Sequence, residues 1–115
     1  MAHIEPTFKN IGSSCVRVQW PGLAAGDTAE PVHLAGDADR SVQVEGTFDG
    51  ATITIEGSID EANFRTLSDP TGTGLTFTAA RIEAITEACV QIRPTVAAGG
   101  AGVDLTVSVL LRSSR

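Results

Sequence analysis

Apolar and polar residues alternate most regularly on either side of the dipeptide Asp49-Gly50. In residues 42–48 before it and residues 51–57 after it, every second position is apolar or glycine. Asp-Gly tolerates positive φ at both central positions of a type I′ turn, the usual connection of a tight hairpin. One register sorts apolar from polar residues on both strands, so the sequence predicts a β-hairpin here. The expected core face consists of Val42, Val44, Gly46, Phe48, Ala51, Ile53 and Ile55.

A second alternating pair flanks the glycine-rich residues 97–102. Residues 89–96 predict one strand and residues 103–111 the return strand of a second hairpin. Pro94 has no amide hydrogen to donate, so its end of the strand is expected at a sheet edge or a bulge. Leu110 falls on the polar face, where it is either an isolated exposed leucine or the start of a subunit contact. The expected inward residues are Val90, Ile92 and Val96 on the first strand and Val103, Leu105, Val107, Val109 and Leu111 on the second.

Weaker patterns predict further short strands over residues 14–20, 31–34, 63–67 and 75–78. Pro21-Gly22 is expected to end the first of these and to begin a loop. Residues 80–88 are ambiguous and predict a strand, or a loop with a helical turn. In total the chain predicts an all-β fold, a β-sandwich or jelly-roll-like barrel of about seven to eight short antiparallel strands. Residues 1–12 are expected to form an extended N-terminal arm, and residues 13–115 a single β-sandwich domain.

Length and charge narrow the possible partners. The chain has 115 residues and a net charge of −6, which suits one acidic domain. Nucleic acid and anionic membrane surfaces are not expected as partners, because both attract basic faces. The sequence has no apolar run long enough for a membrane span and no amino-terminal pattern of a signal peptide, so we expect the chain to fold in a cytoplasm.

The residues that could carry chemistry form no recognisable catalytic or metal-binding motif. Cys15 and Cys89 have neither metal nor redox spacing; two buried thiols are favoured in a reducing compartment, and one long-range disulfide is the alternative. His3 and His33 are too far apart in sequence to complete a zinc site readily. A pairing of Cys89 with His33 has no local signature to support it. We therefore expect no enzyme activity, no cofactor and no metal.

Acidic pairs and glycine runs have simpler interpretations. Asp60-Glu61 and the pair Asp37 and Asp39 lie in expected turns, where solvated charge is the favoured interpretation. Residues 71–74 and 99–102 lack the lysine and the following helix of a phosphate-binding loop. The polar face of the first hairpin, with residues such as Gln43 and Thr54, is either solvated sheet or a wet subunit interface.

Aromatic residues are few, at 4% of the chain. This scarcity argues against a carbohydrate-binding module, which stacks sugars on aromatic rings. One cluster of apolar residues near the amino end includes aromatic rings, and it consists of Trp20, Phe8 and Ile11. It is either a core plug or part of an arm that crosses to a neighbouring subunit.

The segment VQVEGTFDGATITIEGS, residues 42–58, resembles small virion proteins of tailed bacteriophages and prophages. The resemblance continues through Asn63-Phe64, Leu67-Ser68-Asp69 and Ile92-Arg93-Pro94 to the glycine-rich turn and the strand after it. It covers roughly residues 40–112. Phe64 stands where the pattern has tryptophan.

The resemblance implies a capsid decoration (cement) protein without enzymatic activity. Such a protein is expected to be a homo-oligomer, trimer before dimer, seated on a lattice of major capsid protein at the exterior of the virion. The contacts are expected in the N-terminal arm and on the exposed sheet around Leu110. The alternative is a tail or fibre accessory module that binds a host-surface glycan. The candidate contact residues are Ile4, Phe8, Ile11, Trp20 and Leu110.

Overall fold

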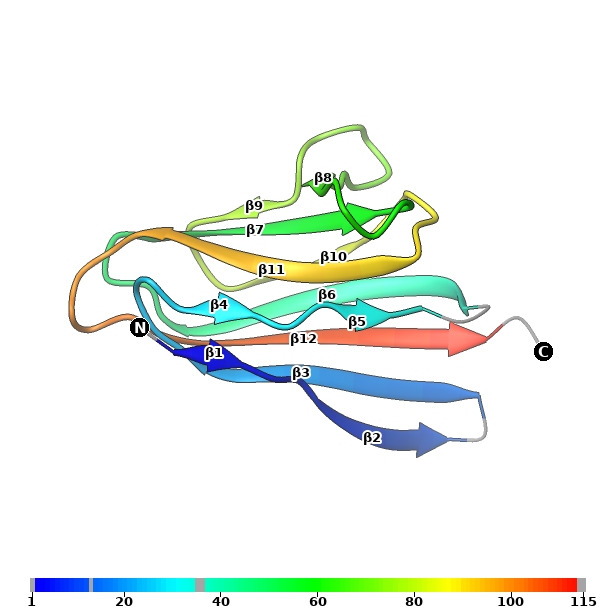
Figure 1. Cartoon of the computed structure of the whole chain (residues 1–115), viewed down its shortest axis with the longest axis horizontal. Helices are drawn as coiled ribbons and strands as arrows, with labels where there is room; N and C mark the ends of the chain where they lie inside the picture. Colours follow the sequence, from blue (N-terminus) through cyan, green and yellow to red (C-terminus); the bar gives the residue numbers. More distant parts are fainter. Residues whose placement is uncertain (1, 13, 35–36, 114–115) are drawn as a thin grey trace.

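The computed structural model describes residues 2–12, 14–34 and 37–113, which form strands, turns and loops without a helix (Figure 1). Two five-stranded sheets pack face to face, and the predicted all-β sandwich is confirmed. Sheet I has the order β10-β6-β12-β3-β2, and its strands are β10 (Arg81–Ala84), β6 (Asp37–Thr47), β12 (Asp104–Ser113), β3 (Cys15–Leu23) and β2 (Thr7–Gly12).

Sheet II has the order β5-β11-β7-β8, and β9 pairs with the same edge of β7 as β8 does. Its strands are β5 (Val32–His33), β11 (Gln91–Ala98), β7 (Ala51–Ser58), β8 (Arg65–Thr66) and β9 (Thr76–Phe77). A separate two-stranded sheet joins β1 (His3–Ile4) to β4 (Thr28–Ala29) in parallel. Residues 3–12, expected as an arm, therefore supply β1 and the edge strand β2.

The core lies between the two sheets, where alternate residues of every long strand meet. Burial of this apolar surface is the main favourable contribution to folding. The predicted inward residues of residues 103–111 are all buried, as are Val42, Val44, Ala51, Ile53 and Ile55. Phe48 is only partly buried. Gly46 is exposed, with φ of 123°, and a Cβ there would lie 2.2 Å from the carbonyl oxygen of Asp104.

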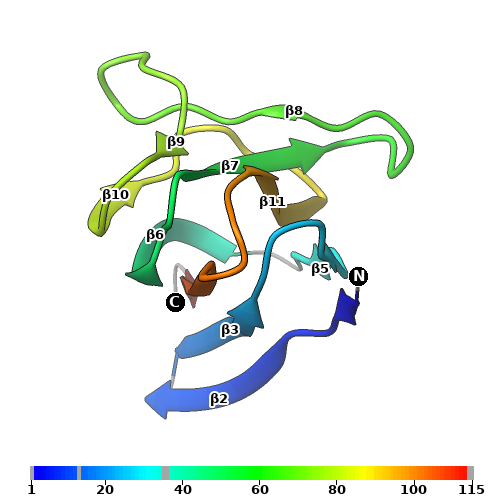
Figure 2. The ribbon, with the colours of Figure 1, turned by 90° about the vertical axis from the view of Figure 1, so that its left-hand side faces the viewer.

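Both predicted hairpins are wrong, although both turns are present. β6 belongs to sheet I and β7 to sheet II, and β11 and β12 are divided between the sheets in the same way (Figure 2). The Asp49-Gly50 turn keeps positive φ at both residues and the hydrogen bond from the Ala51 amide to the Phe48 carbonyl, at 2.8 Å. The turn is therefore a connection between layers, because strands facing each other across a core alternate just as paired strands do.

The two connections lie together at one end of the sandwich and are joined by Asp49. Its carbonyl oxygen accepts a hydrogen bond from the Gly100 amide at 3.1 Å, and its carboxylate accepts one from the Gly102 amide at 2.9 Å. The glycines allow this approach, since a Cβ on Gly100 would lie 2.7 Å from the Asp49 carboxylate. As a result β6 and β12 are neighbours in sheet I, while β7 and β11 are neighbours in sheet II.

Three smaller expectations have definite outcomes. Pro21-Gly22 does not end its strand: β3 continues to Leu23 through a bulge, with Gly22 at φ of 66°. The edge position of Pro94 is confirmed, because β5 pairs only with Gln91 and Ile92 of β11. The ambiguous segment contains a strand, since β10 pairs with β6.

Candidate functional site

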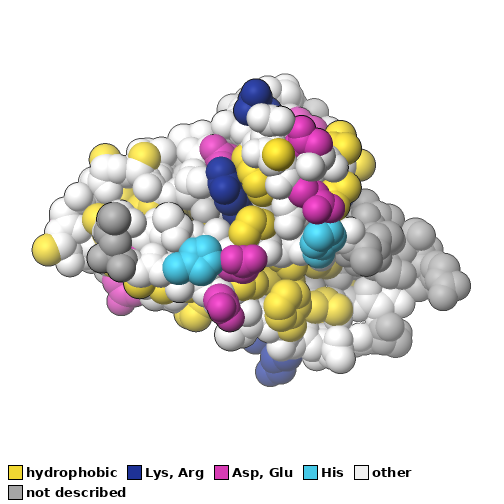
Figure 3. Space-filling view, viewed as in Figure 1, with side chains coloured by type: hydrophobic (Ala, Val, Ile, Leu, Met, Phe, Trp, Pro, Cys, Tyr) yellow, Lys and Arg dark blue, Asp and Glu magenta, His cyan; other side chains and the backbone are white. Residues whose placement is uncertain are grey.

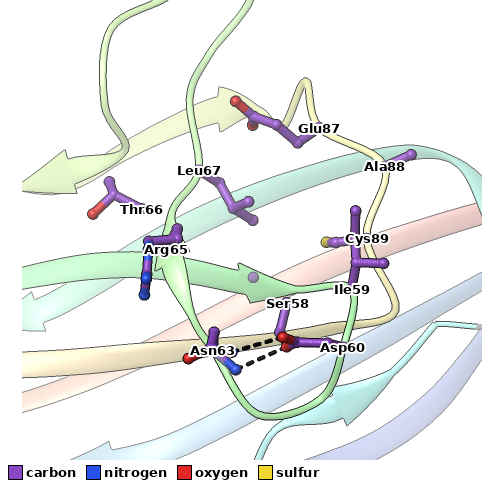
Figure 4. Close-up of a pocket in the computed structure, with 11 residues that line it drawn as sticks. Ser58, Ile59, Asp60, Asn63, Arg65, Thr66, Leu67, Glu87, Ala88 and Cys89 are labelled. Carbon is purple, nitrogen blue, oxygen red and sulfur yellow. Dashed lines mark hydrogen bonds between the residues drawn. The ribbon is translucent and has the colours of Figure 1, made fainter.

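An apolar recess of about 360 Å³ lies beside the end of β7 (Figure 4). Leu67, Ala88 and Cys89 line it together with the loop that follows β7. Gly57 leaves this position free: a Cβ on it would lie 2.8 Å from Leu67 Cδ2 and 2.9 Å from Cys89 Sγ, so these side chains would have to shift. The recess therefore arises where two loops close over a position without a side chain.

Asp60 organises the loop on one side of this recess. Its Oδ1 accepts hydrogen bonds from the Asn63 amide at 2.8 Å, the Ala62 amide at 3.0 Å and the Ser58 hydroxyl at 2.9 Å, and its Oδ2 accepts one from Asn63 Nδ2 at 2.7 Å. These hydrogen bonds, with the Asn63 amide foremost, hold the pKa of Asp60 far below its ordinary value of 3.8. Asp60 is thus an ionised anchor of the loop near neutral pH.

The possible nucleophiles in the recess are not activated. Burial raises the pKa of the Cys89 thiol, which therefore stays protonated near neutral pH. The Ser58 hydroxyl donates to Asp60 and accepts from the Glu61 amide at 2.9 Å. His33, considered above as a partner for Cys89, instead contacts Glu61 Oε2 at 3.1 Å. Cys15 and Cys89 are both free thiols.

Glu87, on the far side of the recess, is also used for structure. Partial burial acts to raise its pKa, but hydrogen bonds from the hydroxyl and amide of Ser68 outweigh this and leave the pKa below its ordinary value of 4.5. The charge of Arg40 also lowers the pKa of Glu87. Arg40 is buried, and its Nε has no hydrogen-bond partner among the described residues. Arg40 was not predicted as a core residue. It lies two residues before Val42 and four before Val44 on the same strand, so its side chain shares their core face.

The outer face of sheet I is not covered by any described element (Figure 2). Its middle consists of two rows of residues in register across all five strands. The first row contains Ala84, Ser41, Leu110, Arg17 and Lys9, and the second contains Ile82, Gln43, Ser108, Gln19 and Thr7. Leu110 is 41% exposed and Ile82 is 64% exposed, so large apolar side chains reach solvent at the centre and at one edge.

The candidate contact residues have different environments. Leu110 lies on the outer face of sheet I, while Phe8 and Ile11 are exposed on β2 and Ile4 packs partly against the core. Trp20 requires a correction: it is fully buried, and its indole N–H donates to the Glu30 carbonyl at 2.7 Å. Of the two alternatives for this residue, the core plug is the correct one.

Other sequence candidates are solvated or used locally. Figure 3 shows the two histidines on one face, each beside an acidic side chain, and His3 Nε2 lies 2.7 Å from Glu30 Oε1. Asp39 pairs with Arg112, whereas the side chain of Asp37 lies outside the described residues. The polar face expected for one hairpin is divided between the two sheets. Gln43 lies on the outer face of sheet I, and Thr54 lies on the outer face of sheet II.

The part of the chain that the structure describes contains no group of three or more His, Cys, Asp or Glu side chains placed to hold a metal ion. It also contains no helix long and apolar enough to cross a membrane. No family model, curated protein or solved structure matches the chain.

Proposed function

We propose that this chain is a structural virion protein that decorates and stabilises a bacteriophage capsid by binding the lattice of major capsid protein. The observation that carries the proposal is the uncovered outer face of sheet I, with Leu110 and Ile82 exposed on it. Ile82 and Leu110 line one hollow on this face, and exposed apolar residues that lie together are typical of a protein-binding surface. The resemblance of residues 40–112 to small phage virion proteins supports the same function.

The exposed side chains of Phe8 and Ile11 on the edge strand β2 support assembly with further copies. We propose a homo-oligomer, trimer before dimer. Its symmetry is expected to be closed, because closed assemblies are the usual form of repeated subunits. An oligomer that binds several lattice positions at once gains affinity without a large contact per subunit.

Stabilisation by such a protein follows from mass action. A protein that binds the mature lattice, but not its dissociated subunits, lowers the free energy of the mature lattice alone. The lattice then resists heat and internal pressure in proportion to the free energy of binding. No catalytic group is required for this function.

The alternative function, a tail or fibre module that binds a glycan, has less support. A sugar-stacking site needs an uncovered aromatic ring near the loops. Phe64 lies near the recess, but the guanidinium of Arg93 lies 3.9 Å from its ring centroid. Phe8 is exposed, but it lies on β2 in the other sheet.

Quantitative mass spectrometry of purified virions from the phage or prophage that encodes the chain tests the proposal. The expected copy number is equal to that of the major capsid protein or a simple fraction of it. A few copies per particle would favour the tail or fibre, and glycan binding would then be measured. Absence from the particles would contradict both functions.

A further inference from the structure

The outer face of sheet I carries an unusual pair of charges. Lys9 on β2 and Arg17 on β3 are direct register partners, so two positive side chains stand opposite each other on the same face. Like charges in this arrangement destabilise a sheet. The chain holds fourteen acidic residues and one lysine, so opposite charge is abundant in the sequence.

Three other described arginines each lie within ion-pairing distance of a carboxylate, and the Lys9–Arg17 pair has no such partner. Arg81 pairs with Glu83, Arg93 with Glu56 and Arg112 with Asp39. Among the described residues, neither Lys9 nor Arg17 lies within ion-pairing distance of a carboxylate. The two cations are therefore left without a counter-charge on an acidic protein.

An apolar hollow adjoins the two cations on the same face. It has a volume of about 250 Å³ and is bounded by Ile82, Leu110 and Arg17. Its floor includes Ser41, Gln43 and Ser108, whose smaller or flatter side chains leave the space open. Leu110 is the register partner of Arg17, so the hollow and the Lys9–Arg17 pair are continuous across β12, β3 and β2.

We propose that this face docks on a protein surface that presents an apolar side chain beside a cluster of carboxylates. The apolar side chain would occupy the hollow, and the carboxylates would pair with Lys9 and Arg17. The inference rests on the proposed function, because it takes the major capsid protein as the protein that presents this surface. Charge complementarity selects an acidic partner despite the net charge of −6, since the outer face of sheet I is locally basic at this edge.

The decisive variant is Lys9→Glu, because docking and folding respond to it in opposite directions. The new carboxylate faces Arg17, so the melting temperature of the free protein is expected to rise. Binding to capsids that lack this protein, measured by co-sedimentation, is expected to weaken at least about tenfold. Arg17→Glu is expected to weaken binding similarly, and wild-type binding is expected to fall with added salt.

Two further sets of variants separate the contributions. Arg65→Glu makes the same charge change at the edge of sheet II and is expected to bind as the wild type does. Leu110→Ser and Ile82→Ser empty the rim of the hollow, so they are expected to weaken binding while leaving its salt dependence unchanged. Sedimentation of the free variants reports the oligomeric state in parallel.

Three other results of these binding experiments would each overturn either the docking face or the proposed function. If the wild type binds capsids and Lys9→Glu and Arg17→Glu bind equally well, the docking face is wrong and the proposed function stands. If these variants instead dissociate the free oligomer and leave capsid binding intact, the occupant of the face is a second copy and the inference is overturned. If the wild type does not bind capsids at all, the proposed function fails and the inference fails with it.

Discussion

Each sheet has charged residues in register on its outer face, and the Arg93–Glu56 pair of sheet II contrasts with the Lys9–Arg17 pair at the β2 edge of sheet I. In sheet II, Arg93 lies opposite Glu56, and its Nε and Nη2 donate to Glu56 Oε1 at 3.2 and 3.1 Å. Arg93 also covers the ring of Phe64. In sheet I, Lys9 lies opposite Arg17, and neither has an anionic partner among the described residues.

This difference shows that the two outer faces are completed in different ways. The charged pair on the outer face of sheet II is satisfied within the chain, because Arg93 pairs with Glu56 and covers the Phe64 ring. The outer face of sheet I has exposed leucine and isoleucine. It contains the Arg112–Asp39 ion pair, but at its β2 edge Lys9 and Arg17 have no counter-charge among the described residues. A surface that is electrostatically incomplete in the isolated protein is where a partner gains most by binding.

The largest expected effect is at the closely packed end of sheet II. Gly57→Ala places a methyl group against Leu67 and the Cys89 sulfur, so the free energy of unfolding should fall by about 1–3 kcal/mol. Ala84→Val, on the exposed outer face of sheet I, should change it by less than about 0.5 kcal/mol. Urea denaturation of both variants measures the contrast. Equal losses would mean that the two regions do not differ in packing.

A smaller effect is expected when the charged pair of sheet II is made to resemble that of sheet I. Glu56→Lys sets two cations opposite each other, and the free energy of unfolding should fall by about 1 kcal/mol. Glu5→Lys is the matched control, because it changes the net charge equally at an exposed residue outside this pair. Urea denaturation at low salt measures both. A loss as large in the control would attribute the effect to net charge.

The reverse change in sheet I should have the opposite sign. Lys9→Glu should raise the free energy of unfolding by about 0.5 kcal/mol, since it creates an opposite-charge pair with Arg17. Lys9→Gln removes only the repulsion and should give a smaller rise. The gain should shrink at high salt. A Lys9→Glu variant less stable than the wild type would show that Lys9 and Arg17 do not repel each other.

The smallest expected change is in the response to acid. The pKa of Glu87 is lower in the folded protein than its ordinary value of 4.5, so its ionised form contributes stability above that pH. The contribution is lost as the pH falls through the lower folded pKa. Glu87→Gln should therefore show a shallower loss of melting temperature between neutral pH and pH of about 3. An unchanged acid profile would show that the Ser68 hydrogen bonds do not favour the ionised form.

Alternation predicted which residues face the core but not which strands pair. Val42, Ile53 and Val107 are buried as expected. The same alternation fits a hairpin and a connection between stacked sheets equally well, because an inward face is apolar in both. The choice depends on long-range partners: β10 and β12 occupy the two edges of β6, so neither edge is left for β7.

The candidate surface was likewise only partly visible in the sequence. Leu110 was predicted on the polar face because it alternates with polar residues along its strand, and it is exposed as expected. The Lys9–Arg17 pair was not predicted because residues 1–12 were expected as an extended arm and not as a strand paired with β3. Trp20 was misjudged as a contact because a large aromatic residue is common both in cores and at interfaces.

The placement of β12 has a consequence for how the protein is made. β12 lies in the middle of sheet I, between β6 and β3, although it follows both in the sequence. Until residue 104 and those after it have been synthesised, β6 and β3 each present an unpaired edge with no neighbour to bridge them. Ribosome-bound intermediates shorter than this should therefore remain sensitive to proteases and prone to aggregation. Folding of this chain waits for synthesis of its central strand.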